Sequence, residues 1–123
     1  DRNDDVSTTV KVPNLKAKTV AQAESQTKQL GLNLVKIGSG DRISNQGVKS
    51  GEKLESGSKI FVNTSGKIIC PDMTGWTYSD LHQFASLTDI KLSIKGTGTV
   101  ASQSVAKGTE LKAGRKLNIK LKE

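Results

Sequence analysis

The chain has 123 residues, a length that fits one domain or two very small ones. Lys and Arg number 19 against 12 Asp and Glu, which gives a formal net charge of +7, and only 33% of the residues are apolar. No segment approaches the roughly 20 consecutive apolar residues of a membrane-spanning helix, so we expect no membrane insertion by this chain. A single cysteine, Cys70, and a single histidine, His82, exclude an internal disulfide, multi-cysteine metal sites and motifs that need two histidines.

The first half of the chain begins with residues 1–9, which lack hydrophobic periodicity and are interpreted as a loose lead-in. Val12-Pro13 predicts a short extended segment, because proline biases the preceding residue away from helix. A capping signature predicts a helix from Thr19 to Leu30, and Gly31 is a plausible stop for it. Alternating apolar residues predict a final strand at Lys59–Thr64.

The second half repeats the same order of elements. Cys70-Pro71 opens an extended segment, and a second capping signature predicts a helix from Thr77 to Thr88. Apolar residues then alternate with polar ones over residues 90–95 and again over Lys116–Lys122, the pattern of strands that are buried on one face. Each half therefore predicts one helix packed on one small sheet.

The two halves align with each other as an internal repeat. Val12-Pro13-Asn14-Leu15 matches Cys70-Pro71-Asp72-Met73 at an offset of 58 residues, and Gln46-x-Val48 matches Gln103-x-Val105 at an offset of 57. We predict an α+β fold of two tandem βαββ modules, residues 10–66 and residues 67–123. The junction between them is too short for a free linker, so we expect the modules to hold a fixed relative orientation.

These residues resemble the PASTA family, small extracellular modules that occur as tandem repeats in Gram-positive cell-wall proteins. The resemblance rests on V-P-N-L and C-P-D-M at the start of each unit, the helix, a G-x-G loop and the ending Q-x-V-x-x-G-x-x-L-x-x-G. It covers about 110 residues. The family occurs in bacterial Ser/Thr kinases and in penicillin-binding proteins. The second unit is most similar to the C-terminal repeats of class B penicillin-binding proteins for cell division.

The resemblance implies a non-catalytic module of a wall-synthesis enzyme in a Gram-positive coccus, without cofactor or metal. It implies a place at the outer face of the membrane and the division septum, tethered by a transpeptidase outside this chain. The expected partners are peptidoglycan or another anionic wall polymer, bound weakly, and divisome proteins. Two alternatives stay open: a structural spacer that orients the transpeptidase, and the sensor ectodomain of a PASTA kinase.

The residues themselves also argue against catalysis. A penicillin-reactive site needs S-x-x-K together with S-x-N and K-T-G, and neither of the latter two motifs occurs in the chain. Units this small leave no obvious room for a sugar cleft with two catalytic carboxylates. We interpret Cys70 as a small buried hydrophobe, since its counterpart in the first unit is Val12, and His82 as a solvent-facing helix residue.

The candidate ligand-binding residues are one tryptophan and a run of cations. Trp76 either packs at the end of the core or serves as a contact for a sugar or another domain, because indole rings do both. The denser basic run supplies the remaining candidates, which are Lys112, Arg115, Lys116 and Lys120. Alternation places the lysines of the last strand on its exposed face. We expect no nucleic-acid partner, because aromatics interleaved with the lysines are lacking.

Overall fold

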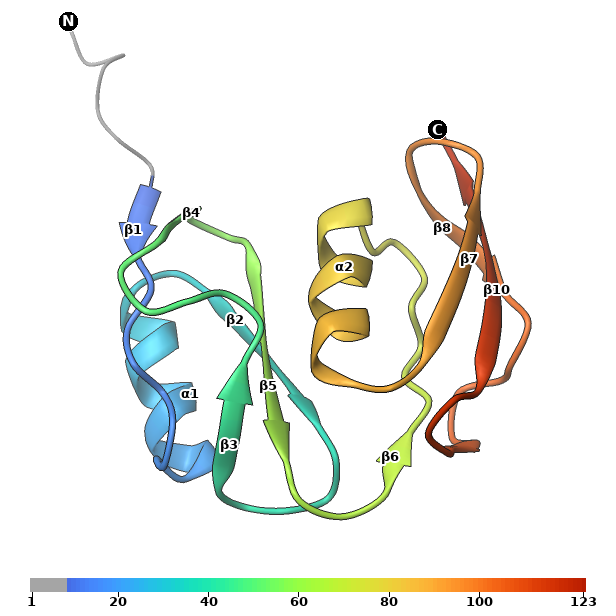
Figure 1. Ribbon diagram of the computed structural model, residues 1–123. Helices are drawn as coiled ribbons and strands as arrows, with labels where there is room; N and C mark the ends of the chain where they lie inside the picture. The colour runs from blue at the N-terminus through green and yellow to red at the C-terminus, as the bar shows by residue number, and fades with distance from the viewer. Residues whose placement is uncertain (1–8) are drawn as a thin grey trace, which may run out of the picture.

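The computed structural model describes residues 9–123 and contains two modules with the same order of elements (Figure 1). The first module consists of β1 (Thr9–Lys11), α1 (Val20–Gln29), β2 (Asn33–Ile37), β3 (Ile43–Gln46), β4 (Lys53–Glu55) and β5 (Lys59–Thr64). The second consists of β6 (Ile68–Ile69), α2 (Tyr78–Leu87), β7 (Lys91–Lys95), β8 (Thr99–Gln103), β9 (Glu110–Leu111) and β10 (Lys116–Lys122). Neither helix is long and apolar enough to cross a bilayer.

Both modules build the same three-stranded sheet around their last strand. β5 pairs with β2 in parallel and with β3 antiparallel, and β10 pairs in the same way with β7 and β8. The α+β class and the tandem modules are therefore confirmed. Each module has more strands than the predicted βαββ unit, since β3 and β8 complete the sheets and the pairs β1–β4 and β6–β9 form small ribbons.

The two predicted helix starts are confirmed down to their caps. Thr19 and Thr77 are the N-caps, and each hydroxyl accepts a hydrogen bond from the backbone N–H three residues later. Gln22 and Asp80 complete the capping boxes by accepting from the backbone N–H of the cap residue. Four backbone donors that would otherwise be unpaired are satisfied in this way, two in each helix.

The glutamine of each Q-x-V motif ties the opening segment of its module to the sheet. The Gln46 side chain accepts from Leu15 N (2.8 Å) and donates to Pro13 O (2.9 Å) and to Val48 O (2.8 Å). Gln103 forms the equivalent three hydrogen bonds in the second module. The motif is thus structural: its side-chain amide replaces the backbone pairing that the opening loop lacks.

The predicted lead-in, residues 1–9, lies outside the described residues except for Thr9, which begins β1 and pairs with Glu55. The repeat register agrees with the elements. Residues of β2 lie 58 positions before their counterparts in β7, whereas the last residue of β3 lies 57 positions before the last residue of β8. The one-residue deletion therefore lies in the second module, between β7 and the end of β8.

The modules pack side by side with α2 between their two sheets (Figure 1). One hydrophobic cluster contains α1 and the near face of the first sheet. The other extends across the junction, from Ile37 and Phe61 of the first sheet through α2 to the inner face of the second sheet. Accordingly α2 buries five of its ten residues and α1 buries two.

Candidate functional site

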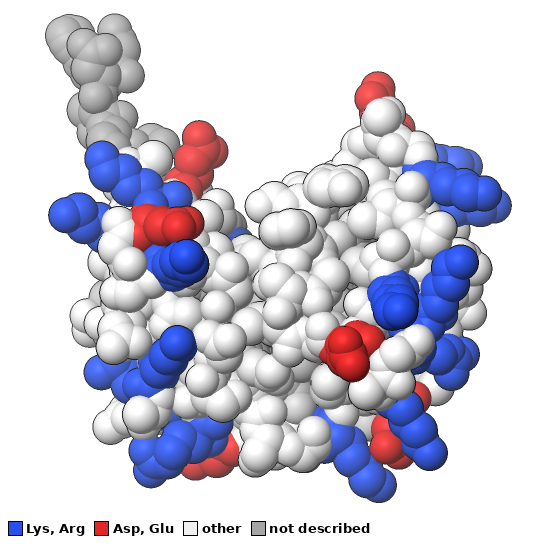
Figure 2. All heavy atoms as spheres, in the orientation of Figure 1, with Lys and Arg blue, Asp and Glu red and all other residues white. Residues whose placement is uncertain are grey.

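The outer face of the β7–β10–β8 sheet is rich in lysine. On β10, buried Leu117 and Ile119 alternate with exposed Lys116 and Lys120. The parallel register with β7 places Lys91 opposite Lys116 and Lys95 opposite Lys120, and paired residues project from the same face of a sheet. We call this surface the lysine face; it consists of Lys91, Lys95, Lys116, Lys120 and Lys122. Lys and Arg accordingly line the right-hand side of Figure 2, over β7 and β10.

Between the lysines lies a hollow of about 270 Å³. Its lining comprises Ser93, Lys95, Asn118, Ile119 and Lys120, with no acidic residue. The Asn118 backbone N–H donates to the Ser104 hydroxyl at 2.9 Å, which fixes one rim of the surface. Cations around uncharged hydroxyl and amide groups suit an extended anionic ligand better than a small molecule that needs enclosure.

The structure brings the four predicted cations to one end and one face of the second module. Lys112 and Arg115 lie in the turn that precedes β10, where Arg115 N donates to Lys112 O and Lys91 N donates to Arg115 O. Lys116 and Lys120 belong to the lysine face. Lys91 and Lys95 were missed as candidates, although their alternation with Ser93 in the sequence indicated a strand with one polar face.

Trp76 does not share this surface. Its indole is 5% exposed and makes edge-to-face contacts with Phe61, at a ring-centroid distance of 4.9 Å, and with Phe84 at 5.9 Å. Phe61 belongs to the first sheet, so the tryptophan links the two modules through their common cluster. A sugar could stack on this ring only if the junction opened, and Trp76 and the cations do not form one site.

The other singled-out side chains lie apart from the lysine face. Cys70 is 1% exposed, and burial raises the pKa of its thiol above the usual 9.0, which keeps it in the unreactive neutral form. His82 is exposed on α2, as predicted. Within residues 9–123, no three His, Cys, Asp or Glu side chains gather where they would hold a metal ion.

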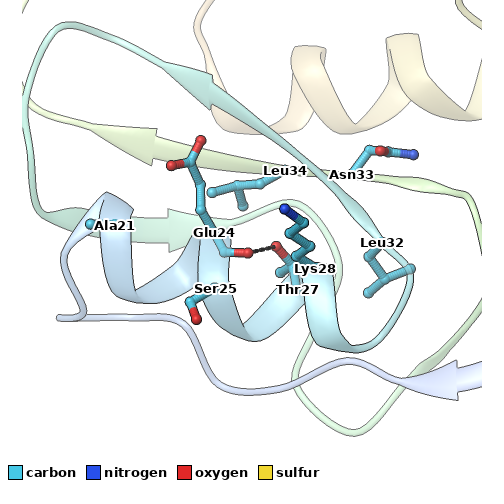
Figure 3. Close-up of a pocket in the computed structure, with 8 residues that line it drawn as sticks. All are labelled: Ala21, Glu24, Ser25, Thr27, Lys28, Leu32, Asn33 and Leu34. Atoms are coloured by element: carbon cyan, nitrogen blue, oxygen red, sulfur yellow. Dashed lines mark hydrogen bonds between the residues drawn. The ribbon is translucent and has the colours of Figure 1, made fainter.

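A groove of about 640 Å³ lies between α1 and β2 (Figure 3). Its charged residues, Glu24 and Lys28, have opposite signs, and the Thr27 hydroxyl is held by the carbonyl oxygens of Ala23 and Glu24. Ala21, Leu32 and Leu34 supply much of the remaining lining. The groove therefore lacks the excess of positive charge that distinguishes the lysine face.

Two capped α+β modules, each with a mixed sheet and a glutamine that clamps its opening loop, define the class of this protein. The PASTA domain family matches residues 10–66 and residues 68–123, and the chain belongs to that family. PASTA domains are extracellular and generally non-catalytic.

Among solved structures, the chain is similar to Penicillin Binding Protein 2X from Streptococcus thermophilus, with a TM-score of 0.82 and 29% sequence identity over 94% of this chain. The chain spans 17% of the length of that protein. The three-PASTA-domain region of a Ser/Thr kinase from Staphylococcus aureus matches with 18% identity, and the extracellular region of the Ser/Thr kinase PrkC from the same organism with 21%. Both kinase matches have a TM-score of 0.39 and cover 92% of this chain, and 65% and 46% of the respective kinase chains. No curated protein sequence matches the chain significantly.

Proposed function

We propose that this chain is the PASTA pair of a penicillin-binding protein and that it acts in peptidoglycan synthesis and cell division by binding nascent peptidoglycan weakly. Within that class, the sequence resemblance favours a cell-division transpeptidase of the penicillin-binding protein 1 type from a Gram-positive coccus. The whole-chain similarity to a penicillin-binding protein supports the assignment, since it extends over both modules together. The proposal places the pair outside the membrane, at the septum, where divisome proteins are a second kind of partner.

The lysine face is the observation that carries the binding proposal. The same face of the first sheet is covered by α2, whereas in the second sheet five lysines replace such a covering. The lysines belong to two neighbouring strands, so their charges add over a continuous surface. At low salt such a surface attracts an anionic wall polymer over long distances. At physiological salt the attraction is screened within about 8 Å. Binding should therefore be weak and should decrease as salt increases.

The test is co-sedimentation of the purified chain with insoluble peptidoglycan over a range of salt concentrations. Lys116→Gln combined with Lys120→Gln should remove most of the bound fraction at low salt. Lys28→Gln combined with Lys36→Gln is the matched control, because it removes the same charge from exposed positions of the first module and should leave binding nearly unchanged. Equal losses in both variants would reduce the effect to net charge and contradict a defined face.

The Trp76→Ala variant tests whether the tryptophan binds the ligand or only stabilises the junction between the modules. Because the indole is buried between modules, this variant should unfold at a lower temperature and still sediment with peptidoglycan at low salt. Loss of sedimentation by a folded Trp76→Ala protein would instead place the tryptophan in the binding site. If the unmodified chain fails to sediment at any salt, the spacer alternative is favoured.

A further inference from the structure

A second concave surface lies at the junction of the modules, on a different side of the molecule's fold from the lysine face. It is a cleft of about 660 Å³, within the range of small-ligand sites. One wall comes from the end of β3 and neighbouring loops of the first module, and the other comes from α2. The lining residues are Asn14, Lys16, Asn45, Gln46, Gly47, Lys49, Ser50, His82, Ser86 and Leu87.

The cleft exists because α2 docks closely against the end of β3. A Cβ atom at Gly47 would lie 2.6 Å from Oε1 and 2.9 Å from Cβ of Gln83, so the helix approaches the backbone where a side chain would obstruct it. The floor is formed by buried residues, Gln46 and Leu87. All three hydrogen bonds of the Gln46 amide serve the fold, which leaves the rim to contact a ligand.

The rim is cationic and offers hydrogen-bond donors. Lys16, Lys49 and His82 line the cleft, and no acidic residue is among its lining residues. Within residues 9–123 neither lysine forms an ion pair. The Asn14 side-chain oxygen accepts a hydrogen bond from the Lys16 N–H, and that of Asn45, in β3, accepts one from the Gln46 N–H. Their NH₂ groups therefore point away from these bonds and remain as donors. Ammonium and amide donors around a cleft without carboxylates match a carboxylate ligand.

The second module provides an internal control for this reasoning. Within residues 9–123 there is no third helix that could lie opposite its equivalent loops, and at the positions of Lys16 and Lys49 it has Thr74 and Ala106. The position of Asn14 is taken by Asp72, whose pKa is lowered by hydrogen bonds from Thr74 and by the nearby Lys107. The loops that lack an opposing wall have thus balanced charges, whereas the loops that form the cleft have unbalanced positive charge.

We propose that the junction cleft binds a carboxylate-bearing glycopeptide, with Lys16 and Lys49 pairing with the carboxylate. The inference rests on the proposed function, because peptidoglycan fragments combine carboxylates with the amides and hydroxyls that Asn14, Asn45 and Ser50 would contact. It goes beyond that function in assigning a second site, made jointly by both modules, for a short fragment. The lysine face would bind the extended polymer independently.

The experiment is an NMR titration of the ¹⁵N-labelled chain with N-acetylglucosaminyl-N-acetylmuramyl tetrapeptide. We expect saturable shifts at Lys16, Gly47, Lys49 and His82. Lys16→Gln combined with Lys49→Gln should weaken this binding by roughly tenfold or more, since each change removes a charge-assisted contact. Lys28→Gln combined with Lys36→Gln removes equal charge from exposed positions outside both binding surfaces and should leave the affinity within about twofold. The dispersion of each variant's spectrum verifies that it is folded.

A tetrapeptide whose carboxylates are amidated tests the chemistry and should bind roughly tenfold more weakly or worse. Shifts confined to the lysine face, or no shifts at any concentration, would overturn the cleft proposal. Equal affinities of the acid and amidated fragments would also overturn it. None of these outcomes would contradict sedimentation of the chain with the polymer, so the cleft proposal and the lysine-face proposal can fail independently.

Discussion

The central strands of the two sheets, β5 and β10, occupy the same place in their modules but are buried differently. β10 alternates strictly: Leu117, Ile119 and Leu121 are buried and the residues between them are exposed. In β5 the consecutive residues Ile60, Phe61 and Val62 are all fully buried. The reason lies outside the strand, since α1 covers one face of the first sheet and α2 covers the other.

The difference is confined to a few positions within the otherwise shared repeat. Phe61 corresponds to Asn118, Gly47 to Ser104, Gln83 to Ser25 and Trp76 to Lys18. In each pair the first residue lies at the junction and the second is its counterpart on an outer surface. The comparison teaches that single side chains distinguish the docked surface from its exposed counterpart, while the strand order and the pairing directions are the same in both modules.

Gln83 illustrates how specific these additions are. β3 leaves the sheet at Gly47, so beyond that residue one edge of β5 has no partner strand. The Gln83 side chain fills the gap: it donates to Lys59 O at 2.9 Å and accepts from Phe61 N at 3.0 Å. A side-chain amide from the second module thereby continues the hydrogen bonding of the first module's sheet.

The largest expected effect comes from Phe61→Ala. The ring is fully buried and contacts Trp76 across the junction, so its removal should cost about 3–5 kcal/mol of unfolding free energy. Urea denaturation measures the loss. Asn118→Ala, at the corresponding exposed position, should stay within about 0.5 kcal/mol. Comparable losses in the two variants would contradict the asymmetry between β5 and β10.

Gln83→Ala should cost about 1–3 kcal/mol, because it leaves the Phe61 N–H and the Lys59 carbonyl without a protein partner in a largely buried place. Ser25→Ala changes the equivalent exposed position of α1 and should be nearly neutral. Hydrogen exchange provides a second measurement, since the Phe61 amide should lose protection in the Gln83 variant. Unchanged protection would mean that the hydrogen bond contributes little.

Gly47→Ala sharpens the comparison further. Its methyl group would overlap the Gln83 side chain, so we expect a loss of about 1–2 kcal/mol by thermal or urea unfolding. Ser104→Ala, at the exposed counterpart, removes only the solvent-exposed hydrogen bond that the Ser104 hydroxyl accepts from the Asn118 N–H, and it should cost less. Combined with Gln83→Ala, the glycine substitution should cost less than the sum of the single changes, because the obstructing atoms Oε1 and Cγ are gone. Strict additivity would argue against direct contact.

The smallest effect is expected for Lys59→Gln. Its ammonium lies 3.6 Å from Asp80 across the junction, but the lysine side chain is 35% exposed, so the pair should contribute less than about 1 kcal/mol. Lys116→Gln, at the equivalent place in β10, should have no measurable effect on stability. Adding salt should reduce the difference between the two variants. A loss for Lys59→Gln as large as that for Phe61→Ala would show that electrostatics dominates the junction.

Local signals explain which parts of the fold were predictable. The capping boxes and the final strands are set by neighbouring residues, so the helices and both central strands were located from sequence. The strands β3, β4, β8 and β9 were missed, because β3 buries only its two end residues, β8 buries only Val100, and β4 and β9 span three and two residues. The alternation predicted for Lys59–Thr64 is wrong, because Ile60, Phe61 and Val62 are all buried. Continuous apolar residues are typical of a strand covered on both faces, and here α2 covers the second face.

The candidate sites were predictable only in part. Alternation placed Lys116 and Lys120 on an exposed face, but their grouping with Lys91 and Lys95 depends on a parallel pairing of distant strands. The role of Gln83 depends on where β3 ends, and the junction cleft depends on the docking of α2. The last two features arise from contacts between modules, which the repeat register does not encode.

The course of the chain through the pair also has a consequence for length. β1 begins the first module and the end of β10 closes the second, and both lie at the upper side of the molecule in Figure 1. The second module runs back alongside the first instead of continuing away from it. A spacer gains reach by placing its units end to end, as linked rods do. This pair gains width, so its two ends are separated sideways, across both modules, and not along the strands.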